Sequence, residues 1–209
     1  MDPSTPIDGV PVRTDPAGGI GAIERLDPNR LGMLLFIMSE ALFFVALIIT
    51  YVVYRGQSTS GPTAATALDV RTAAIFTVFL LSSSASMGFA TGRLGNGDVG
   101  GFRRWLVVTI LLGAVFLAGQ GSEYVRLYRG GITVSGNLWG STFFTLTGFH
   151  ALHVFIGLVA LVSIGLAVRP GKLHPRGGAA AEAVALYWHF VDGVWIVVFS
   201  VVYLWSALT

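Results

Sequence analysis

The sequence predicts an all-α membrane protein that folds as a bundle of five transmembrane helices. Hydrophobic residues make up 54% of the 209 residues and charged residues only 11%, whereas an ordinary soluble domain has about 25% charged residues. The apolar residues gather in five stretches, each long enough to supply the roughly 20 residues that a helix needs to cross a bilayer. These stretches do not alternate between apolar and polar residues, so we expect helices rather than the strands of a β-barrel.

The five expected spans follow one another along the chain with short, turn-rich connections. They cover residues 31–54, 72–92, 105–124, 138–168 and 180–208. The last two are longer than a bilayer requires, so we expect them to tilt or to protrude. Residues 1–30 hold five prolines and no apolar run, which excludes a cleavable signal peptide because such a peptide needs an apolar core. We therefore expect a polar N-terminal cytoplasmic tail over residues 1–30 and a five-helix transmembrane domain over residues 31–209.

The positive charges predict the orientation of the bundle. Five spans place the tail, the second connection and the fourth connection on one side of the membrane. That side carries nine Lys and Arg residues, and the other side carries four. Basic residues concentrate on the cytoplasmic side, so we expect the N-terminus in the cytoplasm and the C-terminus outside. The nine are Arg13, Arg25, Arg30, Arg93, Arg103, Arg104, Arg169, Lys172 and Arg176, and the four are Arg55, Arg71, Arg126 and Arg129.

Several classes of chemistry are excluded by the composition and the motifs. The chain has no cysteine, which excludes disulfides and thiolate metal sites. Its net charge of +2 is too small to indicate a nucleic-acid partner. The glycines Gly18, Gly19 and Gly21 lack the spacing and the preceding strand of a dinucleotide-binding fingerprint. With no phosphate loop or catalytic triad either, we expect no catalytic residue in this chain.

Small residues inside the spans predict close packing of the helices. Lipid is as apolar as leucine, so helices associate in a membrane through close packing and polar contacts. Ser82 and Ser86 lie one small-xxx-small step apart in the second span, and three glycines recur on nearly one face of the fourth. We interpret these residues as packing positions without a chemical role. The glycines are Gly148, Gly157 and Gly165.

Glu40 is the most informative polar residue inside the spans, because a charged side chain at mid-bilayer costs about 2.5–3.5 kcal/mol or more. It lies about ten residues into the first span, which is roughly 15 Å deep at 1.5 Å per residue. Its neighbours, such as Phe36 and Phe44, are apolar. Two hypotheses stay open for this side chain. It is either a proton-exchanging carboxyl or a neutral acid that joins helices through a hydrogen bond.

Two further spans each carry a pair of polar residues at i and i+3. His150 and His153 form one pair, and His189 and Asp192 form the other. Pairs on facing helices can build a metal site, but di-metal sites in bundles use Glu-x-x-His motifs, which neither pair has. We therefore predict no metal and favour an interhelical hydrogen-bond network, since polar groups in lipid pair with one another.

Gln120 and Glu123 have the same spacing at the outer end of the third span. Arg126 and Arg129 are near enough along the helix for Glu123 to pair with one of them. We interpret this group as a structural or subunit-docking part of the same intramembrane network. Glu182, at the start of the fifth span, is expected to be hydrated and is left out of the network.

Four segments resemble, in the same order along the chain, subunit III of the haem–copper oxidases. Residues 32–44 are similar to the helix of that family that bears a glutamate, here Glu40. The other three segments are Q-x-x-E-Y at 120–124, G-S-x-F-F…T-G-F-H-x-x-H-V-x-x-G at 140–157 and W-H-F-V-D-x-V-W at 188–195. The resemblance covers residues 31 to 205, which is nearly all of the chain except the tail.

The resemblance implies an accessory role in a larger enzyme. Subunit III of this family packs against subunit I, which holds the haems and copper and reduces dioxygen to water while it pumps protons. Subunit III has no redox centre, supports proton uptake and stability of subunit I, and holds structural lipids. The resemblance identifies Glu40 with the buried glutamate of the family. It places on the family's polar network Gln120, Glu123, His150, His153, His189 and Asp192.

The same resemblance implies partners and a location. We expect direct packing on subunit I, contact with a subunit II that carries copper-A or haem c, and further subunits or a respiratory supercomplex. Membrane lipids, including a bound phospholipid, are expected, whereas nucleic acid is not. The expected location is the bacterial cytoplasmic (inner) membrane. Many members have seven spans, and this chain resembles the short five-span form, in which another subunit would replace two helices.

Alternative functions stay open beside this one. The resemblance favours an aa3-type cytochrome c oxidase, and the alternatives within the family are subunit III of a quinol oxidase and the accessory subunit of nitric oxide reductase. A proton-coupled transporter, from a different class, would use Glu40, His150 and Asp192 as its relay. Such transporters have repeats and broken helices, whereas no proline interrupts these spans. A diiron membrane enzyme is disfavoured by the ligand types.

Overall fold

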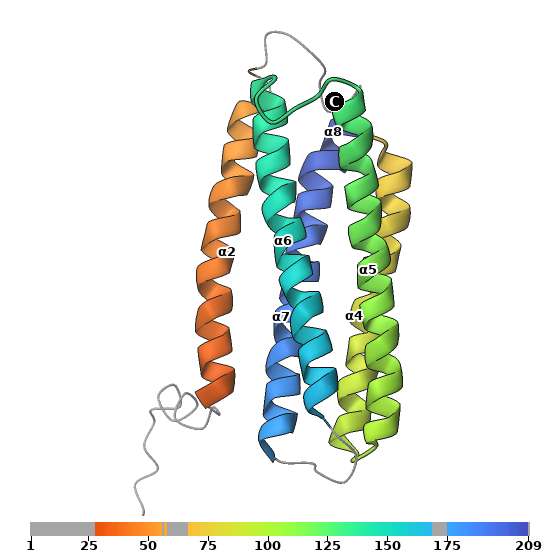
Figure 1. The fold of residues 1–209 in the computed structure, drawn as a ribbon. Helices are drawn as coiled ribbons and strands as arrows, with labels where there is room; N and C mark the ends of the chain where they lie inside the picture. Colours follow the sequence, from red (N-terminus) through yellow and green to blue (C-terminus); the bar gives the residue numbers. More distant parts are fainter. Residues whose placement is uncertain (1–27, 56, 58–66, 169–174, 209) are drawn as a thin grey trace, which may run out of the picture.

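The chain forms a bundle of long antiparallel helices (Figure 1). The computed structural model describes residues 28–55, 57, 67–168 and 175–208, and within these ranges five helices are long and apolar enough to cross a membrane. This confirms the predicted fold class. Consecutive helices run in opposite directions, so the first helix begins and the last helix ends at opposite ends of the bundle (Figure 1). The helices are α2 (Pro28–Tyr54), α4 (Val70–Gly95), α5 (Val99–Arg129), α6 (Leu138–Ala167) and α7 (Pro175–Phe199).

The third predicted span is shorter at both ends than the helix that the structure shows. Hydropathy places it at 105–124, but α5 covers Val99–Arg129 and is about 46 Å long at 1.5 Å per residue. Its polar ends remain helical because Asp98 caps the N-terminus and two arginines lie in the last turn, where positive charge favours a helix C-terminus. The last span also differs, because a π-helical segment η1 (Ser200–Leu204) and a short α8 (Trp205–Leu208) follow α7.

Polar caps fix where the helices begin. The side chain of Asp69 accepts hydrogen bonds from the backbone N–H groups of Arg71 and Thr72 at 3.1 and 3.2 Å. The hydroxyl of Thr72 donates to the same carboxylate at 2.6 Å, and this bond, with the backbone bonds, holds the pKa of Asp69 below its usual value. Asp98 and Asn137 cap α5 and α6 in the same way. Such caps satisfy N–H groups that a helix leaves unpaired.

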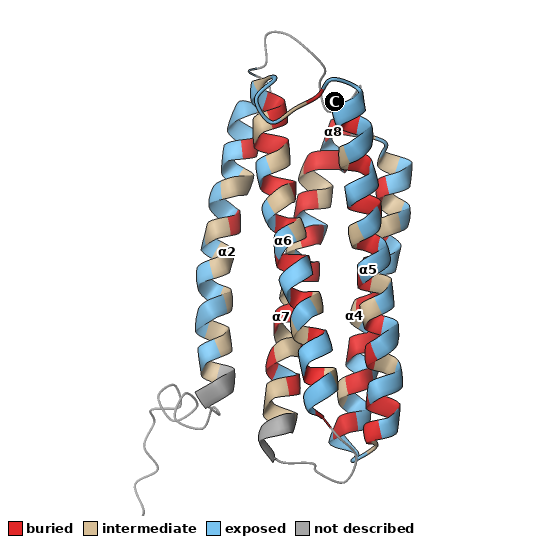
Figure 2. Cartoon of the chain, in the orientation of Figure 1, coloured by how far each residue is buried: buried red, intermediate tan, exposed pale blue. Residues whose placement is uncertain are grey.

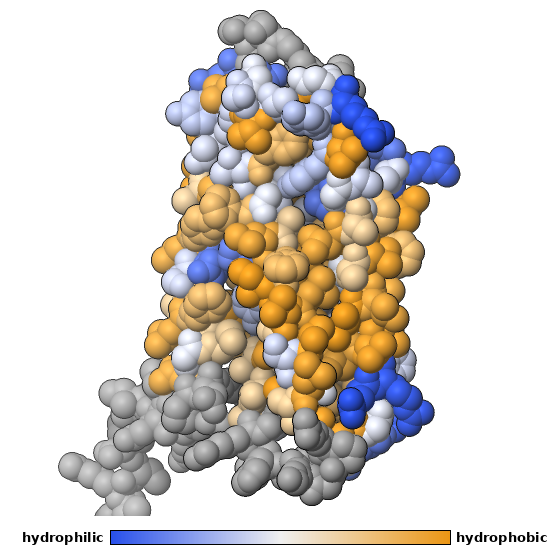
Figure 3. Space-filling model, in the orientation of Figure 1, coloured by the Kyte–Doolittle hydropathy of each residue, from blue (hydrophilic) through white to orange (hydrophobic). Residues whose placement is uncertain are grey.

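The helices α4 to α7 pack closely, whereas α2 lies at the edge of the bundle. α4 pairs most extensively with α5, and α7 contacts α2, α4 and α6. Figure 2 shows that α2 exposes most of its surface, and its buried residues among those described are Phe44 and Tyr51. On the face shown in Figure 3, a wide apolar band covers the middle of the molecule, with hydrophilic groups at both ends. This distribution is the one that a membrane-spanning bundle requires.

Trp188 occupies the centre of the packed helices and explains two of the glycines. A Cβ atom at Gly113 of α5 would lie 2.7 Å from its ring, and one at Gly157 of α6 would lie 2.9 Å from it. The indole N–H of Trp188 donates to the hydroxyl of Ser83 at 3.1 Å. The prediction that Ser82 is a packing position is therefore wrong. Ser82 is exposed, and the neighbouring Ser83 is buried instead.

Candidate functional site

The clearest candidate site is a contact between Glu40 of α2 and His153 of α6. A carboxylate oxygen of Glu40 lies 3.0 Å from Nε2 of His153. Nδ1 of the same ring lies 2.7 Å from the backbone carbonyl of Phe149. A carbonyl oxygen only accepts hydrogen bonds, so Nδ1 carries a proton and donates it. The contact to Glu40 then requires one further proton, which belongs either to the carboxyl group or to Nε2.

The pair can therefore hold one exchangeable proton without a net change of charge. With the proton on Glu40, a neutral acid donates to a neutral imidazole. With the proton on His153, an imidazolium donates to a carboxylate, which is a charge-assisted hydrogen bond. The side chains of Glu40 and His153 remain 22% and 11% exposed, so the pair is partly accessible in the isolated chain, mainly from the Glu40 side. Figure 3 shows a small hydrophilic area within the apolar band on the α2 side.

Aromatic rings and a third helix position this pair. The ring of Phe44 meets the ring of His153 edge-on at a centroid distance of 4.9 Å, and Phe44 is almost fully buried. The hydroxyl of Tyr187 on α7 donates to the backbone carbonyl of His153 at 3.1 Å. Three helices thus converge on His153, and the contact from Tyr187 is one that sequence reasoning missed.

Glu123 lies in a second polar group, between α5 and η1. Arg126 donates to one of its oxygens at 3.2 Å, and the hydroxyl of Tyr203 donates to the other at 2.6 Å. Arg126 also donates to the backbone carbonyl of Ala67, before α4, at 3.2 Å. The pairing with Arg126 was among those expected, but Tyr203 is a residue that sequence reasoning missed. Its position near a span end is typical of an exposed interfacial tyrosine, whereas here it is fully buried.

Gln120 lies one turn before Glu123 and is also buried. Its side-chain nitrogen has no hydrogen-bond partner among the described residues. The hydroxyl of Tyr124 donates to Thr147 of α6 at 2.8 Å, which joins α5 to α6 at the same level. This outer group therefore consists mostly of fixed interhelical contacts.

His150 lies in an aromatic pocket and away from Glu40. Its ring stacks on Trp195 at a centroid distance of 4.8 Å, and the rings of Phe116 and Phe44 approach it edge-on. Neither ring nitrogen has a hydrogen-bond partner within the part of the chain that the structure describes. The structure therefore separates the two histidines of the fourth span, because only His153 reaches a carboxylate.

His189 and Asp192 lie on the side of α7 that faces α4. A hydrogen bond of 2.6 Å joins Nδ1 of His189 to the hydroxyl of Ser84, a residue that the serine run gave no reason to select. His189 is exposed at the protein surface, where it lines a hollow of about 350 Å³ together with Thr91 and Glu182. Asp192 is 3% exposed, and its carboxylate has no hydrogen-bond partner among the described residues.

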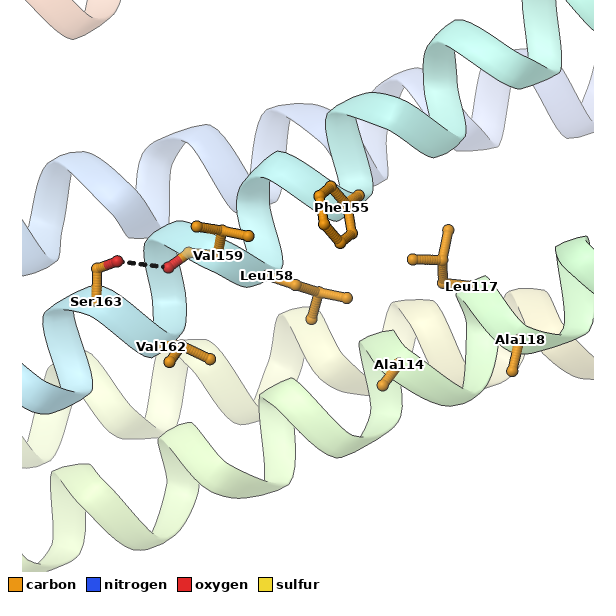
Figure 4. Close-up of a pocket in the computed structure, with 8 residues that line it drawn as sticks. All are labelled: Ala114, Leu117, Ala118, Phe155, Leu158, Val159, Val162 and Ser163. Carbon is orange, nitrogen blue, oxygen red and sulfur yellow. Dashed lines mark hydrogen bonds between the residues drawn. The ribbon is translucent and has the colours of Figure 1, made fainter.

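These groups are too far apart to hold a metal together. No set of three histidine, aspartate or glutamate side chains within the described ranges could coordinate one ion. A groove of about 570 Å³ between α5 and α6 is no better suited to chemistry (Figure 4). Its lining is apolar except for Ser163, whose hydroxyl donates to the backbone carbonyl of Val159 at 2.7 Å. The groove can accept hydrocarbon but offers no group for catalysis.

Comparison with known proteins identifies a family over almost the whole chain. The family model described as cytochrome c oxidase subunit III matches residues 23–207. A protein of Corynebacterium diphtheriae named cytochrome c oxidase subunit 3 is 40% identical over 187 residues, which cover 88% of this chain and 91% of the relative. A protein of Nocardia farcinica named probable cytochrome c oxidase subunit 3 is 38% identical over 185 residues, with coverages of 88% and 91%. One of Thermostichus vulcanus named cytochrome c oxidase subunit 3 is 36% identical over 184 residues, with coverages of 88% and 90%.

Proposed function

Because the chain belongs to the cytochrome c oxidase subunit III family, we propose that it packs against the haem- and copper-bearing subunit I of an aa3-type cytochrome c oxidase and supports proton uptake there. Membership makes the chain an accessory subunit of a haem–copper oxidase, in a family without a redox cofactor of its own. Subunit II, with copper-A or haem c, is the proposed second partner, and membrane phospholipids fill the remaining surface. Further subunits, or a respiratory supercomplex, complete the proposed assembly.

The proposed location is the bacterial inner membrane, with the N-terminus in the cytoplasm. The five spanning helices make the chain a multi-pass membrane protein, and the named relatives include bacterial proteins. The excess of basic residues, nine against four, supports the orientation because cytoplasmic connections are enriched in lysine and arginine. In this orientation Glu40 lies within the membrane, between the two aqueous phases.

The observation that carries the proton-handling role is the contact between Glu40 and His153. The pair holds one proton in either of two positions and keeps the same net charge in both. It also lies at a partly exposed surface of the chain, where a neighbouring subunit can approach. We assign Glu123 a structural role instead, because two donors fix both of its oxygens. The remaining members of the network, Gln120, His150, His189 and Asp192, are proposed to stabilise the bundle.

Purification of the tagged chain in a gentle detergent tests the assembly. We expect haem-bearing partners to copurify and to show the absorption of haem a. Absorption from haem b alone would point to a different class of oxidase, and stoichiometric metal in the isolated chain would contradict an accessory role.

Replacement of Glu40 by glutamine in the assembled oxidase tests the role of the pair. The amide can donate to Nε2 of His153, so the subunit should remain in the complex, but the exchangeable proton is lost. We expect slower proton uptake and faster inactivation during turnover. The matched control is Glu182→Gln, which changes an exposed glutamate in the first half of α7. Equal effects of both variants, or unchanged proton uptake in Glu40→Gln, would contradict the proposal.

A further inference from the structure

A second site is suggested by a hollow of about 340 Å³ at the end of the bundle where α4 turns into α5. Its lining shares no residue with the candidate site described above. Figure 3 shows a strongly hydrophilic patch at the lower right, where α4 and α5 meet, directly beneath the apolar band. The hollow is lined by Arg93, Asp98, Gly101, Arg104, Trp105 and Val108.

The charge around this hollow is positive. Residues 93–104 contain three arginines and one acid, which gives a net charge of +2. The single acid, Asp98, is already engaged, since one oxygen accepts from the backbone N–H of Gly101 at 2.7 Å and the other lies 3.6 Å from a nitrogen of Arg93. The other acidic side chain described at this end, Glu182, lines a different hollow between α4 and α7.

Arg104 leaves most of its hydrogen-bonding capacity unused. Its Nε donates to the backbone carbonyl of Gly100 at 3.4 Å, and its two terminal nitrogens have no partner among the described residues. The wall beside it is apolar. Trp105 packs on Phe89 of α4 at a centroid distance of 5.0 Å, and Val108 lies one turn further along α5, where it is exposed. A charged rim thus lies directly beside an apolar wall.

We propose that this hollow binds the headgroup of an anionic phospholipid. A guanidinium presents donors in a planar fork that matches a phosphate group, so Arg104 and Arg93 contact the phosphate. Trp105 lies at the depth where indole rings favour the membrane interface, and with Val108 it contacts the first segment of an acyl chain. A soluble phosphate would use the rim but not this wall, which favours a lipid.

Native mass spectrometry of the full chain in detergent, with added phosphatidylglycerol, tests the site. Basic residues near a membrane surface contribute about 1 kcal/mol each to the attraction of anionic lipid, which corresponds to about fivefold in affinity. We expect Arg104→Gln to weaken binding about fivefold or more, and Arg93→Gln to weaken it similarly. Arg103→Gln is the matched control, because its charge is adjacent in sequence but does not line the hollow. It should change the affinity less than twofold.

Three further arms separate the outcomes. Phosphatidylcholine should bind more weakly than phosphatidylglycerol, and soluble glycerol phosphate at millimolar concentration should not displace the lipid. Arg104→Lys should recover only part of the affinity, since lysine keeps the charge but loses the planar fork. Equal effects of Arg103→Gln and Arg104→Gln would overturn the proposal in favour of a diffuse surface charge. Displacement by glycerol phosphate would overturn it in favour of a simple anion site.

Discussion

The energetic coupling between Glu40 and His153 is the prediction that bears most directly on the candidate site. Replacing each residue by alanine, singly and together, measures this coupling, because the cycle cancels the packing that His153 loses beside Phe44. Hydrogen bonds between membrane helices average about 0.6 kcal/mol in such cycles and reach about 1.7 kcal/mol. The Glu40–His153 contact is 3.0 Å long, and the ring is already oriented by Phe149.

We therefore expect a coupling energy in the upper part of that range, about 1 to 1.7 kcal/mol. This corresponds to about five- to twentyfold in the unfolding equilibrium constant. The assay is reversible unfolding of the full chain in mixed detergent micelles, followed by the loss of helix. The control cycle combines Glu40→Ala with His189→Ala, because His189 bonds to Ser84 instead. A coupling below about 0.3 kcal/mol, or an equal coupling in the control cycle, would refute the contact.

Three further changes test the surrounding structure. Tyr203→Phe removes the donor to Glu123 and should lower the free energy of unfolding by about 1.5–3 kcal/mol in the same assay, since the bond is to a charged group. Gly157→Ala places a Cβ 2.9 Å from the ring of Trp188 and should cost about 1–3 kcal/mol through overpacking. Asp69→Asn should abolish a pH dependence of unfolding. The folded-state pKa of Asp69 is lowered, so its stabilisation is present above the usual value near 4 and is lost as the pH falls below it.

Two of these changes have a control in the same chain. The control for Tyr203→Phe is Tyr128→Phe, which alters an exposed tyrosine. It should change the free energy of unfolding by less than about 0.5 kcal/mol. Gly88→Ala adds a Cβ that meets nothing within 4 Å, so it should be neutral or stabilising by up to about 1 kcal/mol. Similar losses in Gly88→Ala and Gly157→Ala would contradict the close packing at Trp188. If Asp69→Asn leaves the pH dependence of unfolding unchanged, another titrating group is responsible for that dependence.

Hydropathy predicts the fold of this chain well because the bilayer imposes one length and one polarity on every span. It predicts helix ends less well, since α5 extends beyond 105–124 through capped and charged turns that are helical but not apolar. The serine run shows a second limit. Small residues at 82 to 86 predict an interface, but the side of the helix that faces the interface depends on its neighbours, and the structure buries Ser83 and Ser86.

The sequence does not predict which residues the intramembrane polar side chains contact. Residues at i and i+3 differ by about 60° around a helix, which is enough to direct His153 toward α2 and His150 into the aromatic core. Nothing in the local sequence distinguishes these two directions. The partner of Glu123 depends on η1, because that π-helical segment carries Tyr203 to a carboxylate 80 residues earlier in the chain. Such contacts follow from the packing of whole helices.

The number of hydrogen-bond donors separates the two intramembrane glutamates by role. Glu123 accepts from Arg126 and from Tyr203, so a proton that binds this carboxyl group removes the negative charge that Arg126 pairs with and weakens both hydrogen bonds. Among the described residues Glu40 has one hydrogen-bond partner, His153, which can itself take the proton. A proton can therefore move between Glu40 and His153 while their hydrogen bond is kept, whereas protonation of Glu123 weakens the contact that joins α5 to η1. This contrast supports the proposal that Glu40 exchanges a proton and that Glu123 attaches α5 to η1.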